Sequence, residues 1–481
     1  MNKKKIIFAG VASAVVILIL LALVLLMPAQ DKGPASNEYI DDNATAFVFS
    51  DSGITVKDGD FTDYTIEGTA LTLDGAGTYV VSGSCNDGSI KIKKGTEGVT
   101  LIMNSLELTS SDTAPVSCNK SSQVKIIAAS GTTNTLCDSA MNNDEEYADN
   151  TNAENAVIKC KDGSDVTIEG TGIINITANS KNGIKSGATT DAEGEASLTI
   201  QDVTLNITAD INDGINAESA LDIVSGNITI DASDDGIHCD YIMNIGSEEA
   251  DGPAITVKES TEGLEAATLN IYSGNLDITS EDDGLNAANS DLADYDFALN
   301  ISGGTVKIDA ATGDGIDSNG SLTISGGTVE IFSASSGDNQ PLDCDGTLSI
   351  TGGTVLGVGA AGMGNNISSG QTFVIFGSSS QQPGNPSASG ISAGSTITIK
   401  DADGNTIYTG KTVRNAGYAI FSSAELEEGS TYTLYIDGTS IESAQAASSL
   451  QNQQAQSPAG VNTPGTEPPA KPGNQADKPA K

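Results

Sequence analysis

A phrase made of an acidic residue, a glycine and an aliphatic residue recurs through the middle of the 481-residue chain. Its copies are Asp213-Gly214-Ile215, Asp235-Gly236-Ile237, Glu262-Gly263-Leu264, Asp283-Gly284-Leu285 and Asp314-Gly315-Ile316, with a related Asn182-Gly183-Ile184 before them. The aliphatic residues are 31, 22, 27, 21 and 31 positions apart. Carboxylates beside the exposed carbonyls of a glycine turn are hard oxygen donors, which Ca²⁺ prefers in proteins. If the copies stack, they form a row of cation ligands.

A second phrase indicates how the copies are positioned. Between them come the short strand-like segments Leu221–Ile223, Leu269–Ile271, Leu299–Ile301, Leu322–Ile324 and Leu348–Ile350, each followed by a glycine turn. Repeats of this size cannot bury both faces of their strands alone, whereas stacked repeats can. The pattern predicts an all-β fold, namely a right-handed parallel β-helix with a small C-terminal β cap, preceded by an N-terminal transmembrane helix. A β-propeller, which needs longer antiparallel blades, is the weaker alternative.

Aligning the phrases predicts three columns of side chains along the β-helix. The inward aliphatic column is Val116, Leu136, Ile158, Ile184, Ile215, Ile237, Leu264, Leu285, Ile316 and Leu342. Two residues later comes an inward column of small side chains, Cys118, Cys160, Ser186, Ala217, Cys239, Ala266, Ala287, Ser318 and Cys344. The residue between the two points outward, because strand side chains alternate between faces. The outward column is Ser117, Lys159, Lys185, Asn216, His238, Glu265, Asn286, Asp317 and Asp343.

Four of the six cysteines fall in the small inward column. A cysteine at a packed interior position behaves as a small hydrophobic side chain. We therefore expect buried free thiols, and disulfides, which an exported chain permits, are the alternative. The sequence has no Cys-x-x-Cys pair and no histidine other than His238, so nothing supports a zinc site or a cysteine nucleophile.

The outward column and the turns beside it are strongly acidic in the later repeats. Neighbouring coils lie about 4.8 Å apart, where unit charges repel by about 1 kcal/mol even in bulk water. Ca²⁺ offsets such repulsion, since it takes about six to eight oxygen ligands with flexible geometry. The predicted calcium ligands are Asp213, Asp234, Asp235, Asp240, Glu262, Glu265, Asp282, Asp283, Asn286, Asp314, Asp317, Asp343 and Asp345. The alternative is that Asp-Gly pairs only form turns and that acidic faces only aid solubility.

The two ends of the chain differ from the repeats. Three lysines, Lys3 to Lys5, precede the uncharged run 6–27, which is long enough to span a bilayer as a helix. We expect an uncleaved anchor rather than a removed signal peptide, with the following chain on the extracellular face of the membrane, and secretion as the alternative. The predicted division is 1–27 transmembrane anchor or signal segment, 28–40 linker, 41–380 β-helix, 391–441 β cap and 442–481 disordered tail.

Composition excludes two classes of function. The chain has 64 acidic and 22 basic side chains and a formal net charge of −42. It therefore does not bind nucleic acid by neutralising phosphates, which needs clustered lysine and arginine. It contains no Trp, so it has no tryptophan platform for flat crystalline polysaccharide. Hydrophobic residues make up 38% of the chain, which is still enough for a packed core.

Several segments together resemble a known family. They are Tyr79–Gly83, Val124–Ile127, Asn134–Asp138, the Asp-Gly-Ile and Asp-Gly-Leu coils, Ser395–Ile399 and Ser430–Leu434. Over most of residues 45–440 the chain resembles bacterial exported carbohydrate-binding β-helix domains of clostridial type, and it is similar to the pectate lyases of polysaccharide lyase family nine. The resemblance implies Ca²⁺ on the β-helix surface and binding of acidic plant polysaccharide such as polygalacturonate, with cellulose as a further candidate.

The resemblance to the lyases is incomplete at the site. Those enzymes use an Asp-Asp-x-x-Asp calcium cluster and a lysine that abstracts a proton. Here 282–286 and 234–238 match the first two aspartates and end in Asn286 and His238. Lys258 and Lys307 are the candidate bases near the acidic coils. We expect calcium-dependent, non-catalytic binding of uronate-rich polysaccharide, and a pectate lyase or an envelope adhesin without a sugar ligand are the alternatives.

Overall fold

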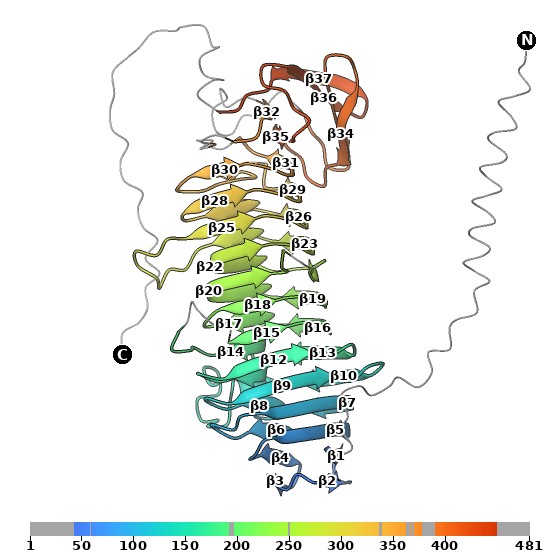
Figure 1. The fold of residues 1–481 in the computed structure, drawn as a ribbon, viewed down its shortest axis with the longest axis vertical. Coiled ribbons are helices and arrows are strands. Elements are labelled where there is room, and N and C mark those ends of the chain that lie inside the picture. The colour runs from blue at the N-terminus through green and yellow to red at the C-terminus, as the bar shows by residue number, and fades with distance from the viewer. Residues whose placement is uncertain are drawn as a thin grey trace, which may run out of the picture.

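The computed structural model describes residues 43–449 except 58, 192–196, 249–250, 336–338, 362–366, 368–369 and 378–389. Within these residues the protein is all-β, and the one helix is the 3₁₀ turn η1 (Ala140–Asn142). Stacked coils build an elongated solenoid with the C-terminal sheet at its far end (Figure 1). No helix in the described ranges is long and apolar enough to cross a membrane. The predicted anchor 6–27 and linker 28–40 lie outside the described residues.

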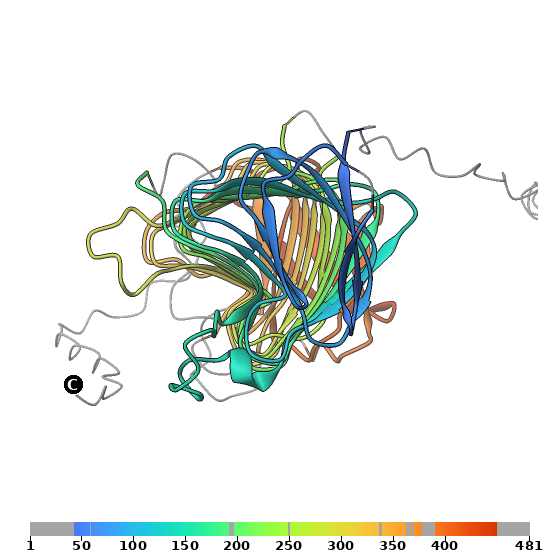
Figure 2. The same cartoon turned by 90° about the horizontal axis from the view of Figure 1, so that it is seen from below.

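Each coil contributes strands to three columns of parallel pairs, which we call faces A, B and C (Figure 2). Face A contains β4 (Ala70–Leu73), β6 (Ser89–Ile92), β8 (Val116–Cys118), β11 (Ala156–Cys160), β14 (Asn182–Ser186), β17 (Ile215–Ala217), the first parts of β20 (Ile237–Ile245) and β22 (Leu264–Ile271), β24 (Leu285–Ala287) and β27 (Ile316–Ser318).

Face B follows face A in each coil. It contains β9 (Gln123–Ala128), β12 (Asp165–Glu169), β15 (Leu198–Ile200), β18 (Leu221–Ile223), the second parts of β20 and β22, β25 (Ala298–Ile301), β28 (Ser321–Ile324) and β30 (Leu348–Ile350). Face C contains β10 (Thr133–Cys137), β13 (Ile173–Ala178), β16 (Thr204–Ala209), β19 (Asn227–Ala232), β21 (Ala254–Val257), β23 (Asn275–Ser280), β26 (Thr305–Ala310), β29 (Thr328–Phe332) and β31 (Thr354–Gly359). The long strands β5 (Gly77–Cys85) and β7 (Val99–Thr109) precede β9 and β10 on faces B and C, and the N-terminal strand β1 (Thr45–Ser50) pairs in parallel with β5.

Antiparallel strands cover both ends of the solenoid. At the start, β1 (Thr45–Ser50) pairs with β2 (Gly53–Val56), and β3 (Tyr64–Glu67) pairs with β4. At the end, β35 (Tyr418–Ser422) joins β31 and β32 (Phe373–Phe376). A separate sheet is ordered β34 (Thr406–Lys411), β33 (Thr396–Lys400), β36 (Thr431–Ile436), β37 (Thr439–Gln445). Strand β37 pairs with β36 as far as Gln445, so the cap extends beyond residue 441, where it was expected to end.

The strand register reproduces most of the predicted inward columns. Val116, Ile158, Ile184, Ile215, Ile237, Leu264, Leu285, Ile316 and Leu342 follow one another in register on face A. Leu136 was wrongly placed in this column. It lies on face C between Leu108 and Ile176, because the coil containing β10 reaches face A only later, at β11.

The expectation of free thiols is confirmed. The six cysteines lie in described segments and none is disulfide-bonded. Five are buried, and Cys118 and Cys160 face each other on adjacent coils. They fill the interior as small hydrophobic side chains do.

A column of glycines allows the coils to stack closely in the turn before face A. A Cβ atom added to Gly263 would lie 2.2 Å from the carbonyl oxygen of Gly284 and 2.3 Å from Cγ2 of Ile278. No rotamer change relieves a contact with backbone, so the coils would have to separate. The glycine of the recurring phrase is therefore required by packing.

We predict that Gly263→Ala lowers the free energy of unfolding by about 1–3 kcal/mol, because overpacking forces the backbone to shift. Urea unfolding measures this change. The exposed Glu259 lies in the same turn, and Glu259→Ala serves as a control with an expected change within about 0.5 kcal/mol. A Gly263→Ala variant as stable as the wild type would contradict the observed stacking.

Candidate functional site

Face A presents one outward side chain per coil. Its strands are short, as in Ile215–Ala217, so the middle residue points away from the core and its two neighbours point inward. The register places Ser117, Lys159, Lys185, Asn216, His238, Glu265, Asn286 and Asp317 directly after one another, and Asp343 follows the bridge between Ile316 and Leu342. We call this column the ladder. It has the membership expected from the sequence, and Lys91 precedes Ser117 in the same register.

A second column stands beside the ladder, in the turn that leads from face C into face A. In each coil the glycine N–H of the turn donates to the carbonyl of the acidic residue in the next coil, at 2.9–3.1 Å. The acidic residues so aligned are Asp213, Asp235, Glu262, Asp283 and Asp314. The carboxylates of neighbouring coils are therefore stacked along one side of the solenoid.

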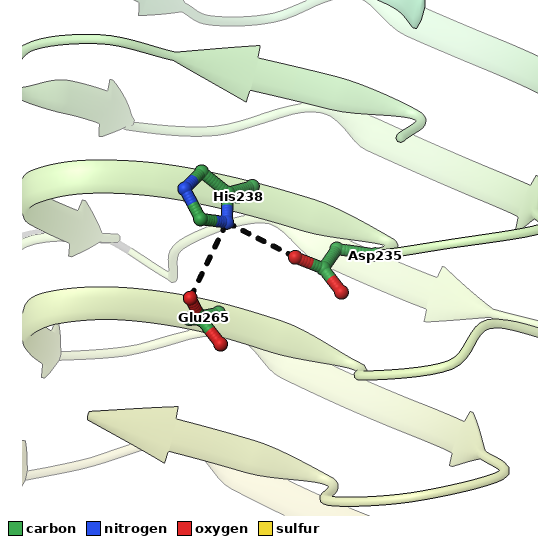
Figure 3. A group of neighbouring side chains, drawn as sticks. All are labelled: Asp235, His238 and Glu265. Carbon is green, nitrogen blue, oxygen red and sulfur yellow. Dashed lines mark hydrogen bonds and ion pairs between the residues drawn. The ribbon is translucent and has the colours of Figure 1, made fainter. Parts of the chain in front are cut away.

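His238 neutralises the middle of this acidic region (Figure 3). Its Nδ1 lies 3.0 Å from Oδ2 of Asp235 and its Nε2 lies 3.1 Å from Oδ1 of Asp240. Oε1 of Glu265 is a further 3.5 Å contact of Nδ1. A neutral imidazole has one donor nitrogen, so two carboxylate partners require the doubly protonated ring. Burial opposes this charge, but the hydrogen bonds to Asp235 and Asp240 outweigh it and raise the pKa of His238 to about 11.

Asparagine side-chain amides donate hydrogen bonds to the carboxylates on either side of His238. Nδ2 of Asn216 donates to Oδ2 of Asp213 at 2.7 Å. Nδ2 of Asn286 donates to Oε2 of Glu262 at 2.8 Å and to Oε2 of Glu265 at 3.0 Å. Burial, together with a hydrogen bond to Glu262, raises the pKa of Glu265 to about 9. The carboxylates from Asp213 to Glu265 are thus balanced by donors and protons from the chain itself.

Among the described residues the later coils have no cation comparable to His238, although backbone N–H groups of Asp314, Gln340 and Cys344 donate to one oxygen each of Asp283, Asp314 and Asp343. One carboxylate oxygen each of Asp314, Asp317 and Asp343 lie within 4.8 Å of one another. No ion pair among the described residues reaches these three or Asp283. Burial first, and the neighbouring carboxylates second, raise the pKa of Asp283 to about 8, of Asp314 to about 7 and of Asp317 to about 6. We call Asp283, Asp314, Asp317 and Asp343 the late acidic cluster.

Two buried amide oxygens beside the late acidic cluster have no hydrogen-bond partner among the described residues. They are Oδ1 of Asn286 and Oε1 of Gln340. Asn286 is 6% exposed and Gln340 is 4% exposed, so water does not readily reach them. An unpartnered buried amide costs about 1–3 kcal/mol. A carboxylate cannot relieve that cost, because it too is an acceptor.

The direction of the Asn286 oxygen follows from a neighbouring asparagine ladder on face B. There Nδ2 of Asn270 donates to Oδ1 of Asn244 in the previous coil at 2.9 Å, and its own Oδ1 accepts from Asn300 in the next coil at 3.0 Å. Nδ2 of Asn286 likewise faces the previous coil. Its Oδ1 is therefore directed to the next coil, which carries Asp317. The amide oxygen of Asn286 and the carboxylate of Asp317 therefore stand on adjacent rungs, and oxygen ligands of this kind fit a hard cation.

The remaining predicted ligands lie around these two regions. Asp240 contacts His238, whereas Asp234 and Asp282 are exposed in the turns before face A, and Asp345 is exposed after Cys344. Burial and the charge of Asp235 raise the pKa of Asp234. The predicted ligands therefore form two groups. The negative charges around His238 are offset by the histidine and by asparagine amides, whereas those of the late acidic cluster have no cationic side chain among the described residues beside them.

The two candidate lysine bases lie away from the ladder. Lys307 is on face C, where its Nζ lies 3.2 Å from Oδ1 of Asp277. Lys258 is exposed in the turn after β21. Neither belongs to the outward column of face A.

Gln340 was not among the predicted ligands. Its carbonyl accepts from the N–H of Gly315, so it takes the position of the acidic residue in the turn of the last coil. Pro341 stands where the other coils have glycine, which hides the coil from a search for the recurring phrase. The spacing of 26 residues from Asp314 to Gln340 lies within the range of the other repeats and is the signal that identifies it.

These observations define a class of protein, an all-β solenoid with a linear array of charged and amide groups along one face. The chain belongs to the family of carbohydrate-binding domain-containing proteins, whose profile matches residues 67–268 and 249–434. A carbohydrate-binding domain-containing protein of Acetivibrio thermocellus is 36% identical over 109 residues, which are 22% of this chain and 37% of that relative. The match thus spans little more than a third of the relative's length.

A solved structure is also similar to this chain. It is described as the polysaccharide lyase-like protein from C. thermocellum, as a gadolinium derivative. The identity is 25%, the TM-score is 0.36, and the alignment covers 64% of this chain and 97% of that one. Membership of the carbohydrate-binding family is shown, whereas a specific relation to polysaccharide lyase family nine remains a resemblance.

We predict that the protein loses stability as pH rises when divalent ions are removed. Asp283, Asp314 and Asp317 keep protons in the folded state up to pKa values of about 8, 7 and 6, whereas the unfolded chain releases them near about pH 4. The folded state therefore binds more protons across this window, and stability falls as pH rises through it. Thermal unfolding in EDTA should give a lower Tm at pH 8 than at pH 5. A Tm that stays constant or rises would contradict the raised pKa values of the late acidic cluster.

A second prediction concerns His238. His238→Gln removes the charge that Asp235, Asp240 and Glu265 surround, and hydrogen bonds to charged groups are worth about 1.5–3 kcal/mol. We expect a loss of about 2 kcal/mol in urea unfolding in EDTA at pH 7, partly recovered by added Ca²⁺. Equal stability of His238→Gln and the wild type would show that the ring is neutral in the folded protein.

Proposed function

We propose that this protein binds acidic polysaccharide of the polygalacturonate type without cleaving it, through Ca²⁺ held on face A. The observation that carries the proposal is the late acidic cluster with its two unpartnered amide oxygens. The ionised carboxylates and the two amide oxygens are all possible ligands of a divalent cation, which would replace the protons that these carboxyl groups otherwise keep. Membership of the carbohydrate-binding domain family supports a sugar polymer as the ligand.

The ligands for Ca²⁺ would be carboxylates of Asp314, Asp317 and Asp343, with Asp283 and the amide oxygens of Asn286 and Gln340 beside them. Ca²⁺ takes about six to eight oxygens, and the half-buried ladder side leaves positions for a ligand from solution. A polymer carboxylate would occupy such a position. His238 and the asparagine amides already balance the carboxylates of the earlier coils, so we place the ion in the late coils.

A bridging cation also explains how a polyanion approaches a chain of net charge −42. Repulsion between exposed charges is screened beyond about 10 Å in physiological salt. At contact, Ca²⁺ shared between protein and polymer carboxylates converts repulsion into attraction. Residues 6–27 would anchor the solenoid, a right-handed β-helix in this proposal, at the extracellular face of the membrane, where polymers of this size are met.

The proposal predicts that Ca²⁺ is required for polymer retention. Purified protein should bind immobilised polygalacturonate in Ca²⁺ and elute in EDTA, and elemental analysis should find calcium in the protein. Asp317→Asn should weaken retention about tenfold or more, since a charged ligand contributes about 1.5–3 kcal/mol. Asp231→Asn, an exposed position on face C, is the charge-matched control.

Three outcomes would contradict this proposal. Retention that EDTA does not change would exclude the calcium bridge. Unsaturated product absorbing in the ultraviolet would identify a pectate lyase. No retention on any acidic or neutral polysaccharide would favour a scaffold without a sugar ligand.

A further inference from the structure

The early coils of the ladder contain an unpaired basic group that the calcium proposal does not use. Lys159 and Lys185 face each other directly on adjacent coils. Like charges opposite one another on neighbouring strands are destabilising. The arrangement therefore costs stability in a protein that has many more carboxylates than lysines.

The other lysines of this region are paired, whereas Lys159 is not. Nζ of Lys185 lies 3.0 Å from Glu218, Nζ of Lys161 lies 2.6 Å from Glu154, and Nζ of Lys181 lies 2.7 Å from Glu145. Within the described segments Lys159 makes no hydrogen bond and no ion pair. Burial, and then the charge of Lys185, lower the pKa of Lys159.

A buried hydroxyl without a partner stands next to Lys159 on the ladder. Ser117 is 0% exposed, and its Oγ has no hydrogen-bond partner in the part of the chain that the structure describes. It lies in register between Lys91 in the previous coil and Lys159 in the next. Lys91, like Lys159, makes no hydrogen bond or ion pair with any described residue. Three successive rungs thus carry two ammonium groups and one hydroxyl and no carboxylate, whereas the late acidic cluster is made of carboxylates.

We propose that Lys91, Ser117 and Lys159 form an anion site that binds a carboxylate of the same acidic polysaccharide directly, without a metal ion. Small shifts of the flexible lysine side chains would bring an entering carboxylate to the Ser117 hydroxyl. The proposal rests on the proposed function for the identity of the polymer. It assigns the early coils to direct binding and the late coils to binding through Ca²⁺.

The dimensions of the ladder agree with one polymer occupying both ends. Lys159 and Asp317 are six register steps apart, which at about 4.8 Å per coil is about 29 Å. A linear polyuronate carries a carboxylate on every sugar, so one chain along face A presents carboxylates at both positions. A short oligomer would reach one end only.

The test compares Lys159→Met with the wild type and with Lys94→Met. Methionine keeps the length of the side chain and removes its charge, and Lys94 is an exposed lysine of the same region that lies off the ladder. Lys159→Met should bind polygalacturonate about tenfold more weakly in Ca²⁺, since a charge-assisted hydrogen bond is lost, and its Tm should be equal or higher. Lys94→Met should bind as the wild type does.

In a second experiment monogalacturonate is added to the protein in EDTA and the Tm is measured. It should stabilise the wild type and not Lys159→Met, because one carboxylate suffices for the anion site. If Lys159→Met binds the polymer normally and monogalacturonate has no effect, the anion site is wrong while calcium-dependent retention can still hold. If the wild type retains no polymer but monogalacturonate still stabilises it through Lys159, the proposed function fails and the anion site stands.

Discussion

The close stacking of coils is the constraint on which the rest of this protein depends. The coils from Asp213 to Asp314 each place an acidic residue beside that of the next coil, and neighbouring strands lie about 4.8 Å apart. The column of glycines permits this close approach, because a Cβ atom there would collide with the next coil. The chain meets the resulting repulsion in different ways along its length. Asn216 and Asn286 donate amide hydrogens, and His238 supplies an internal positive charge. The late acidic cluster receives backbone N–H groups at Asp283, Asp314 and Asp343 but no internal positive charge from any described residue, so protons or an external cation must offset the remaining repulsion.

The close stacking of coils also brings residues that are far apart in the sequence into one continuous surface, which suits a polymer. Because every face A strand points one side chain away from the core, the ladder is one residue wide and many coils long. Its character changes from donors at Lys91 and Ser117 to acceptors at Asp317 and Asp343. A small ligand would contact one or two rungs, whereas a linear polyanion contacts many weak positions at once. The architecture therefore favours extended polysaccharide, in agreement with the family to which the chain belongs.

Much of this arrangement was predictable from sequence, since register in a solenoid follows from repeat phrases alone. The ladder from Ser117 to Asp343 and the cysteine column were identified in this way. Leu136 was assigned to the wrong column because the sequence around it resembles that of a face A strand, whereas its strand pairs on face C. Gln340 was missed because Pro341 interrupts the phrase. The sequence could not predict which carboxylates have a partner within the chain. The contacts of His238 with Asp240 and Glu265, and the unpartnered oxygen of Asn286, depend on the directions of the side chains.

The central claim is that a divalent cation shares the oxygens of the late acidic cluster. Anomalous diffraction from crystals grown with Ca²⁺ tests it most directly. The account predicts a peak about 2.3–2.6 Å from carboxylate oxygens of Asp314, Asp317 and Asp343, with Oδ1 of Asn286 or Oε1 of Gln340 among its ligands. A peak only beside Asp213 or Asp235, or no peak on face A at millimolar Ca²⁺, would contradict it.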